Sequence, residues 1–156
     1  MDTTSAHRLV QAIPDSSVAG GMHWDFSALW LHPEIFDKFC DEIVCKCKSI
    51  SPTVVLAMES DGMLFGTQIA LRLRLPYAVI RKKGKLPGPV LTENYETSDG
   101  RKGALSVQQD VIQQDANVLL LDNVLTDGGW FALKAKFGFE KFVYFVLNFS
   151  HHGVRG

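Results

Sequence analysis

Three short polar segments hold the side chains able to do chemistry in this chain. Residues 59–62 read ESDG, residues 81–88 read RKKGKLPG, and residues 122–129 read DNVLTDGG. Carboxylates accept hydrogen bonds and bind hard cations, whereas Arg and Lys bind phosphate. The basic segment is therefore suited to bind an anion such as phosphate, with a solvated surface loop as the alternative.

Each polar segment comes after a short apolar run. These runs are residues 53–57 (TVVLA), 77–80 (YAVI) and 118–121 (VLLL). Short continuous apolar runs are typical of parallel strands that are buried on both faces. Ligands of open parallel sheets bind at the carboxyl ends of the strands. We therefore expect the three polar segments to share one ligand-binding edge.

Helical patterns separate these runs. We predict helices over residues 5–13, 33–48 and 63–73, and a further helix after residue 129. Apolar side chains recur at helical spacing in residues 33–48, and Pro33 is favourable in a first turn.

Further extended segments complete the pattern. Residues 22–26 alternate apolar and polar side chains, residues 90–95 and 104–107 form two arms of a hairpin, and residues 142–147 (FVYFVL) form a fourth buried strand. Strands that alternate with helices indicate an α/β fold with a parallel sheet covered on both faces.

Composition limits the class of protein. The chain has 156 residues, of which 46% are hydrophobic and 21% charged, with a formal net charge of -1. This predicts one soluble domain and no basic surface for nucleic acid or an anionic membrane. No apolar run approaches the ~20 residues of a membrane span. The first residues lack a signal-peptide pattern, so we expect a cytoplasmic protein.

The three cysteines, Cys40, Cys45 and Cys47, lie close together in a predicted helix. Structural zinc sites space paired cysteines by two to four residues and need four ligands, which this cluster does not supply. Reduced thiols in a cytosolic protein are the expected state, and we predict no protein-bound metal site.

The sequence resembles a known family. LLLDNVLTDGGW (residues 119–130) resembles a degraded form of the 5-phosphoribosyl-1-diphosphate motif of type I phosphoribosyltransferases. RKKGKLPGP, MESDGMLFG, the early IPD and LSVQQD resemble adenine phosphoribosyltransferases, in that family's order and at close to its spacing. The resemblance runs from about residue 13 to about residue 149, and GKLPG at residues 84–88 is its most specific signal.

The resemblance implies a single type I phosphoribosyltransferase-like domain. Its central, mainly parallel sheet would be flanked by helices, with an N-terminal helix and hood over about residues 1–32, a core over 33–149 that includes a flexible hairpin loop, and a tail over 150–156. The implied reaction of purine salvage converts adenine and phosphoribosyl diphosphate into AMP and pyrophosphate with Mg²⁺ as cofactor. The implied assembly is a homodimer.

The resemblance also implies roles for individual residues. The base would be bound at Met22 and Trp24. The family's catalytic Glu falls near Ser98, where Glu96 or Asp99 could substitute and the alignment does not choose. Residues implied to bind phosphoribosyl diphosphate are Glu59, Ser60, Asp61, Arg81, Lys82, Lys85, Asp122, Asn123, Thr126, Asp127, Gly128 and Gly129.

Several of these positions depart from the family's pattern. Asp61 and Trp24 each replace an Arg, Asn123 replaces an acid, and Asp127 and Trp130 each replace a Thr. A carboxylate about 4 Å from a phosphate charge costs on the order of 4 kcal/mol at an effective dielectric constant of about 20. The indole of Trp24 either stacks on a purine or closes an empty pocket.

Two interpretations follow from these departures. In the first, the protein has weakened or lost transferase activity at a degenerate site, and binds a purine or nucleotide or serves as a partner subunit. In the second, it is an active adenine phosphoribosyltransferase in which Mg²⁺ and the basic loop compensate for the changes.

Overall fold

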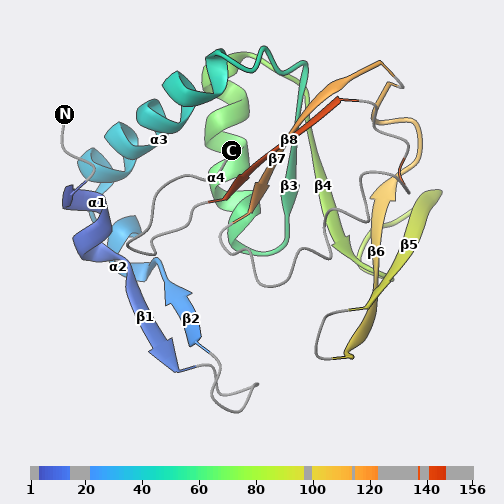
Figure 1. Cartoon of the computed structure of the whole chain (residues 1–156), viewed down its shortest axis with the longest axis horizontal. Helices are drawn as coiled ribbons and strands as arrows, with labels where there is room; N and C mark the ends of the chain where they lie inside the picture. The colour runs from blue at the N-terminus through green and yellow to red at the C-terminus, as the bar shows by residue number, and fades with distance from the viewer. Residues whose placement is uncertain are drawn as a thin grey trace.

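The computed structural model describes residues 4–14, 22–96, 100–113, 115–122, 137 and 141–146. The predicted helix after residue 129 lies outside these ranges. Within them, a six-stranded sheet has the order β5-β6-β4-β3-β7-β8, and β1 and β2 form a separate two-stranded sheet. Figure 1 shows this pair beside α1 and α2, away from the larger sheet. The arrangement confirms the predicted α/β class.

The six-stranded sheet is mainly parallel at its centre. β3 (Val54–Met58) pairs in parallel with β4 (Tyr77–Lys82) and with β7 (Asn117–Asp122), and β7 pairs in parallel with β8 (Lys141–Val146). The antiparallel hairpin of β5 (Val90–Glu96) and β6 (Lys102–Gln108) joins the sheet through β4. These strands match the predicted runs to within two residues.

The register aligns the carboxyl ends of β3, β4 and β7. Ala57 of β3 is the partner of both Val79 in β4 and Leu121 in β7. The chain therefore leaves β3, β4 and β7 at the same edge of the sheet, as the order of apolar runs and polar segments predicts.

Both faces of the sheet are buried. Alternate residues of a strand point to opposite faces, and the buried side chains of β3 and β7 divide accordingly between two clusters. The first cluster holds Val55, Leu119 and Leu121, and the second holds Val54, Leu56, Met58, Val118 and Leu120. This two-sided burial explains the continuous apolar runs in the sequence.

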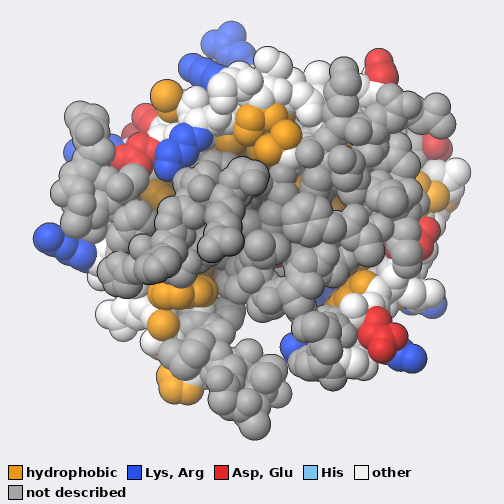
Figure 2. Space-filling view, viewed as in Figure 1, with side chains coloured by type: hydrophobic (Ala, Val, Ile, Leu, Met, Phe, Trp, Pro, Cys, Tyr) orange, Lys and Arg blue, Asp and Glu red, His pale blue; other side chains and the backbone are white. Residues whose placement is uncertain are grey.

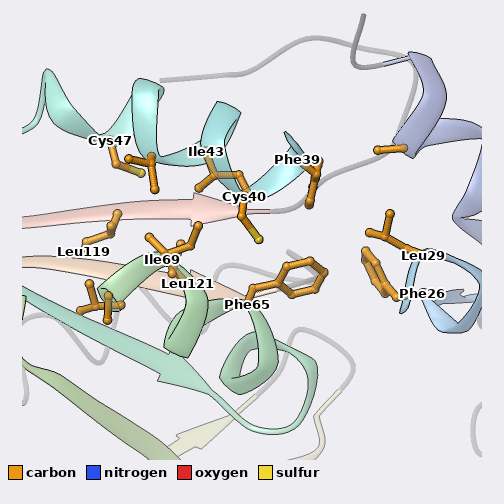
Figure 3. Close-up of a cluster of buried hydrophobic side chains, with 14 of the residues drawn as sticks. Phe26, Leu29, Phe39, Cys40, Ile43, Cys47, Phe65, Ile69, Leu119 and Leu121 are labelled. Carbon is orange, nitrogen blue, oxygen red and sulfur yellow. The ribbon is translucent and has the colours of Figure 1, made fainter. Parts of the chain in front are cut away.

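Two long helices pack on the face of the first cluster. α3 (Pro33–Lys48) begins with Pro33 in its first turn, and α4 (Asp61–Leu73) follows β3. Figure 3 shows Cys40, Ile43 and Cys47 of α3 with Ile69 of α4 and Leu119 of β7 in one buried group. Arg72 of α4 also pairs with Asp37 and Asp41 of α3. No helix in the described part of the chain is long and apolar enough to span a membrane.

An aromatic group joins the N-terminal segment to α4. The ring of Phe65 in α4 lies 5.3 Å from Phe26 and 4.9 Å from Trp30, between centroids. It also lies 5.8 Å from the rings of Phe36 and Phe39 in α3. Edge-to-face ring pairs at these separations are favourable, so Phe65 ties α2 (Ser27–Trp30) and α3 to the helix that enters the site.

The N-terminal segment differs from the prediction. α1 (Thr4–Leu9) ends early, and residues Gln11–Pro14 form strand β1, which pairs antiparallel with β2 (Met22–Asp25). The predicted helix over residues 5–13 is therefore wrong at its end. Ile13 is β-branched and Pro14 lacks an N–H, so pairing with β2 competes well against one more helical turn.

Candidate functional site

Two of the predicted segments meet at a backbone contact. Gly62 is in the first turn of α4, and a Cβ built on it would lie 2.7 Å from the carbonyl oxygen of Leu121 and 3.3 Å from Cα of Asp122. Only glycine fits such an approach. The start of α4 therefore lies directly against the end of β7, and ESDG and Asp122 share one edge.

Glu59 connects the segment after β3 to the end of β4. Its backbone N–H donates to the carbonyl of Ile80 at 3.1 Å. Its carboxylate accepts from Nε of Arg81 at 2.7 Å and from the backbone N–H of Lys82 at 2.9 Å. The Glu59–Ser60 peptide bond is cis. Glu59 is therefore anchored to β4 through its backbone and both oxygens of its side chain.

The surroundings of Glu59 favour the ionised carboxylate. Partial burial raises its pKa, but the Lys82 N–H, the hydrogen bond from Arg81 and the charge of Arg81 lower it. The net result is a pKa below the ordinary value of 4.5. The side chain of Glu59 is only 13% exposed, so this pair lies in a setting where charge interactions are poorly screened.

The basic loop after β4 is a folded turn. Arg81 donates through Nη1 to the carbonyl of Lys85 at 3.2 Å, and the N–H of Lys85 donates to the carbonyl of Lys82 at 3.1 Å. Gly84 supports the turn with a positive φ of 83°. Lys82, Lys83 and Lys85 are exposed. The loop thus presents ammonium groups to solvent from a fixed backbone, as phosphate binding requires.

Two further carboxylates lie at the same edge. Asp122, at the end of β7, is buried with 6% exposure. Asp61 is half-buried and is the first residue of α4, where the helix dipole favours a negative charge. Ser60 is exposed and makes no side-chain capping bond to α4. The edge therefore combines acids with the cations of the basic loop.

The predicted base-binding residues belong to β2. Trp24 pairs with Ala12 of β1, and its half-buried side chain packs against the first core cluster. Stacking of its indole on a purine and closure of an empty pocket both stay predictions. Met22 pairs with Pro14 at the start of β2.

The predicted catalytic loop is described only at its start. Glu96 ends β5, and its carboxylate lies 3.6 Å from the ammonium of Lys102 across the hairpin. Ser98 and Asp99 lie outside the described residues, as do Asn123, Thr126, Asp127, Gly128, Gly129 and Trp130. Their predicted roles stay predictions.

Charge on the visible surface is dispersed. On the face seen in Figure 2, the described basic and acidic side chains lie in small separate groups. Among the described residues, no cluster of three or more His, Cys, Asp or Glu side chains is arranged to hold a metal ion.

The sequence pattern did not predict the pairing of Glu59 with Arg81. Both residues were assigned separately to phosphate binding. The available signal was their equivalent placement, each one residue beyond the paired positions Met58 and Ile80 of adjacent parallel strands.

The strand order and the acids and cations at the carboxyl edge define a type I phosphoribosyltransferase fold. The crystal structure of the APRTase from Giardia lamblia complexed with 9-deazaadenine superposes with a TM-score of 0.83, at 28% identity over 94% of this chain and 84% of that one. A structure of adenine phosphoribosyltransferase from Rhodothermus marinus superposes with a TM-score of 0.78, at 25% identity over 90% of this chain and 82% of that one.

Sequence similarity identifies the family. No family model matches the chain. The adenine phosphoribosyltransferase of Actinobacillus pleuropneumoniae serotype 5b is 35% identical over 127 residues, which are 81% of this chain and 70% of the relative. That of Borreliella burgdorferi strain ZS7 is 31% identical over 122 residues, 78% of this chain and 69% of the relative. The chain belongs to the adenine phosphoribosyltransferase family.

Proposed function

We propose that the protein is an adenine phosphoribosyltransferase that converts adenine and phosphoribosyl diphosphate into AMP and pyrophosphate. The observation that carries the proposal is the meeting of three elements at one edge of the sheet. These are the buried Asp122, the first turn of α4 and the basic loop after β4. Membership of the family supplies the base and the reaction.

The charges at this edge suit the chemistry. The bond from C1′ of the ribose to pyrophosphate breaks, a ring nitrogen of adenine bonds to C1′, and the proton of that nitrogen passes to the departing pyrophosphate or to water. Negative charge grows on the departing pyrophosphate, so nearby cations stabilise the transition state. Lys82 and Lys85 supply those cations, and Asp122 accepts hydrogen bonds from the ribose hydroxyls.

Magnesium fits the donor groups at this edge. Mg²⁺ prefers oxygen ligands and is commonly held by one or two carboxylates together with substrate phosphates. Asp122, at the end of β7, is the carboxylate that would hold it together with the phosphates of the substrate. The bound ion would offset the charge of pyrophosphate.

A second candidate function is nucleotide binding without efficient transfer. The observation that favours it is Asp61, a negative charge in the first turn of α4, where helices otherwise attract anions. The replacements at Asn123, Asp127 and Trp130 also favour binding without efficient transfer. In this case the degenerate site would hold a purine or nucleotide, or the chain would act as a partner subunit.

The remaining parts of the proposal concern organisation. We propose one domain over residues 1–156, with a hood over about 1–32, a core over 33–149 and a tail over 150–156. We further propose that the protein is a cytoplasmic homodimer that binds neither nucleic acid nor a membrane. Sedimentation analysis would decide the oligomeric state.

Pyrophosphate release tests the two candidates. Purified protein would receive phosphoribosyl diphosphate, Mg²⁺ and either adenine, hypoxanthine or guanine, beside an authentic adenine phosphoribosyltransferase. We expect pyrophosphate release with adenine and none with hypoxanthine or guanine. In the variant Lys82→Ala/Lys85→Ala the KM for phosphoribosyl diphosphate should rise, whereas Lys46→Ala/Lys48→Ala on α3 should match wild type. Binding of phosphoribosyl diphosphate without release would favour the second candidate, and neither binding nor release would refute both.

A further inference from the structure

Glu59 ties two loops of the site together through three hydrogen bonds. Its backbone N–H reaches Ile80, and its two carboxylate oxygens accept from Nε of Arg81 and from the N–H of Lys82. Every one of these partners belongs to the end of β4.

The same contacts determine the shape of the basic loop. Because Nε of Arg81 is held by Glu59 while Nη1 donates to the carbonyl of Lys85, the guanidinium spans the turn from its start to its far side. The N–H of Lys83 donates to the carbonyl of Ala104 in β6 and fixes the next residue. The backbone that presents Lys82 and Lys85 is therefore constrained at Glu59, Arg81 and Ala104.

The carboxylate of Glu59 is poorly placed to bind substrate itself. Its side chain is 13% exposed, against 34% for Arg81, and each oxygen already accepts a short hydrogen bond. Its charge has the same sign as pyrophosphate, so an ionised Glu59 aimed at the ligand would repel it. Glu59 can therefore favour anion binding only through the groups that it holds in place, which are Arg81 and the backbone of Lys82.

We propose that Glu59 is a positioning residue: it fixes Arg81 and the backbone of Lys82 so that the exposed cations of the basic loop meet pyrophosphate in one arrangement. This proposal rests on the proposed transferase function and assigns Glu59 a role other than direct contact with phosphoribosyl diphosphate. A loop held in advance binds its ligand without the loss of conformational freedom that a mobile loop would suffer.

Four variants test the proposal. Glu59→Gln keeps the size of the side chain and one oxygen acceptor but removes the charge paired with Arg81. Arg81→Gln removes the other partner, and the double variant removes both. Glu34→Gln is the matched control, since Glu34 is an exposed carboxylate in the first turn of α3.

Steady-state kinetics separate positioning from general damage. In Glu59→Gln we expect the KM for phosphoribosyl diphosphate to rise roughly tenfold, as a displaced binding group would cause, while the KM for adenine stays at the wild-type value. Glu59→Asp, which keeps the charge, should recover part of the affinity. Glu34→Gln should change neither constant.

The double variant decides whether Glu59 acts through Arg81. Residues that act as one unit give non-additive effects, so the double variant should bind pyrophosphate no more weakly than Arg81→Gln. Effects that add on a logarithmic scale would overturn the proposal, because Glu59 would then act independently. Tighter binding of pyrophosphate by Glu59→Gln would also overturn it.

Limited trypsin digestion gives a readout independent of catalysis. Wild type and Glu59→Gln would be compared for cleavage after Lys82, Lys83 and Lys85, with Glu34→Gln beside them. Faster cleavage at these sites in Glu59→Gln alone would support the anchoring, and equal rates would overturn it. If wild type neither binds pyrophosphate nor releases it, the proposed function fails, and the digestion alone decides whether Glu59 anchors the loop.

Discussion

The contact between Gly62 and the end of β7 predicts a sharp response to one methyl group. In Gly62→Ala the new Cβ would lie 2.7 Å from the carbonyl oxygen of Leu121 and 3.3 Å from Cα of Asp122. Both partners are backbone atoms of a central strand, so neither can rotate away as a side chain could. The start of α4 must instead move away from β7.

The size of the effect follows from that displacement. Carbon contacts are most favourable at about 3.5–4.0 Å, so α4 and β7 must separate by roughly one ångström. Overpacking of this kind costs about 1–3 kcal/mol, which lowers the melting temperature by roughly 2–4 °C per kcal/mol in a domain of this size. The shift also moves the ESDG segment relative to Asp122, and we expect affinity for pyrophosphate to fall about tenfold or more.

Gly66→Ala is the matched control for this prediction. One turn later in α4, its Cβ would meet Cβ of Ala57 at 2.6 Å and the ring of Tyr77 at 2.8 Å. The melting temperature should therefore fall in both variants. Calorimetry should show weakened pyrophosphate binding only in Gly62→Ala. A wild-type melting temperature in Gly62→Ala would refute the backbone contact. Equal losses of affinity in both variants would refute its role in the site.

Four further predictions follow from described contacts. Phe65→Ala should lose about 3–5 kcal/mol of unfolding free energy in urea titrations, because its ring is fully buried among four others. A maleimide should label exposed Cys45 in the native protein and all thiols only in urea, as counted by mass spectrometry, since burial raises the pKa of Cys40 to about 12 and of Cys47 to about 11. The pKa of Glu59 is lower in the folded state, so its contribution to stability is present above the ordinary value of 4.5 and is lost as the pH falls through the folded value. The free energy of unfolding of Glu59→Gln, measured by urea titration, should accordingly fall less on acidification than that of wild type. Finally, Asp61→Arg combined with Asp127→Thr should bind pyrophosphate more tightly by calorimetry, and unchanged binding would show that these carboxylates do not block the site.

Much of the sheet could be predicted because its central strands are buried on both faces. Residues in the middle of β3 and β7 contact one core cluster or the other in alternation, so the positions between Asn117 and Asp122 of β7 and those of β3 are all apolar, and the runs stand out in the sequence. The same reasoning places the carboxyl ends of β3, β4 and β7 at one edge, and the pairing of Ala57 with both Val79 and Leu121 confirms that alignment. The ends of elements are less predictable, as the strand over Gln11–Pro14 illustrates.

The contacts within the site could not be predicted in the same way. Gly62 could be recognised as a turn residue, but its approach to Leu121 depends on how α4 crosses the sheet. The pair of Glu59 and Arg81 joins residues that are distant in the chain and close only because β3 and β4 are parallel neighbours. Periodicity and composition contain no information about such tertiary distances.

Asp61 shows how one carboxylate can have opposite effects on stability and on binding. At the start of α4 it interacts favourably with the helix dipole, which is worth about 0.3–1 kcal/mol at an exposed site and up to about 2 kcal/mol at a partly buried one such as this. The same first turn attracts phosphate, so the carboxylate occupies a place that suits a ligand's negative charge. Asp61→Arg should therefore lower the melting temperature while it raises pyrophosphate affinity, and Asp61→Asn should give a smaller change of both kinds. If Asp61→Arg lost stability without gaining affinity, the carboxylate would be a helix-stabilising residue alone, and the explanation for any weak turnover would have to come from elsewhere in the site.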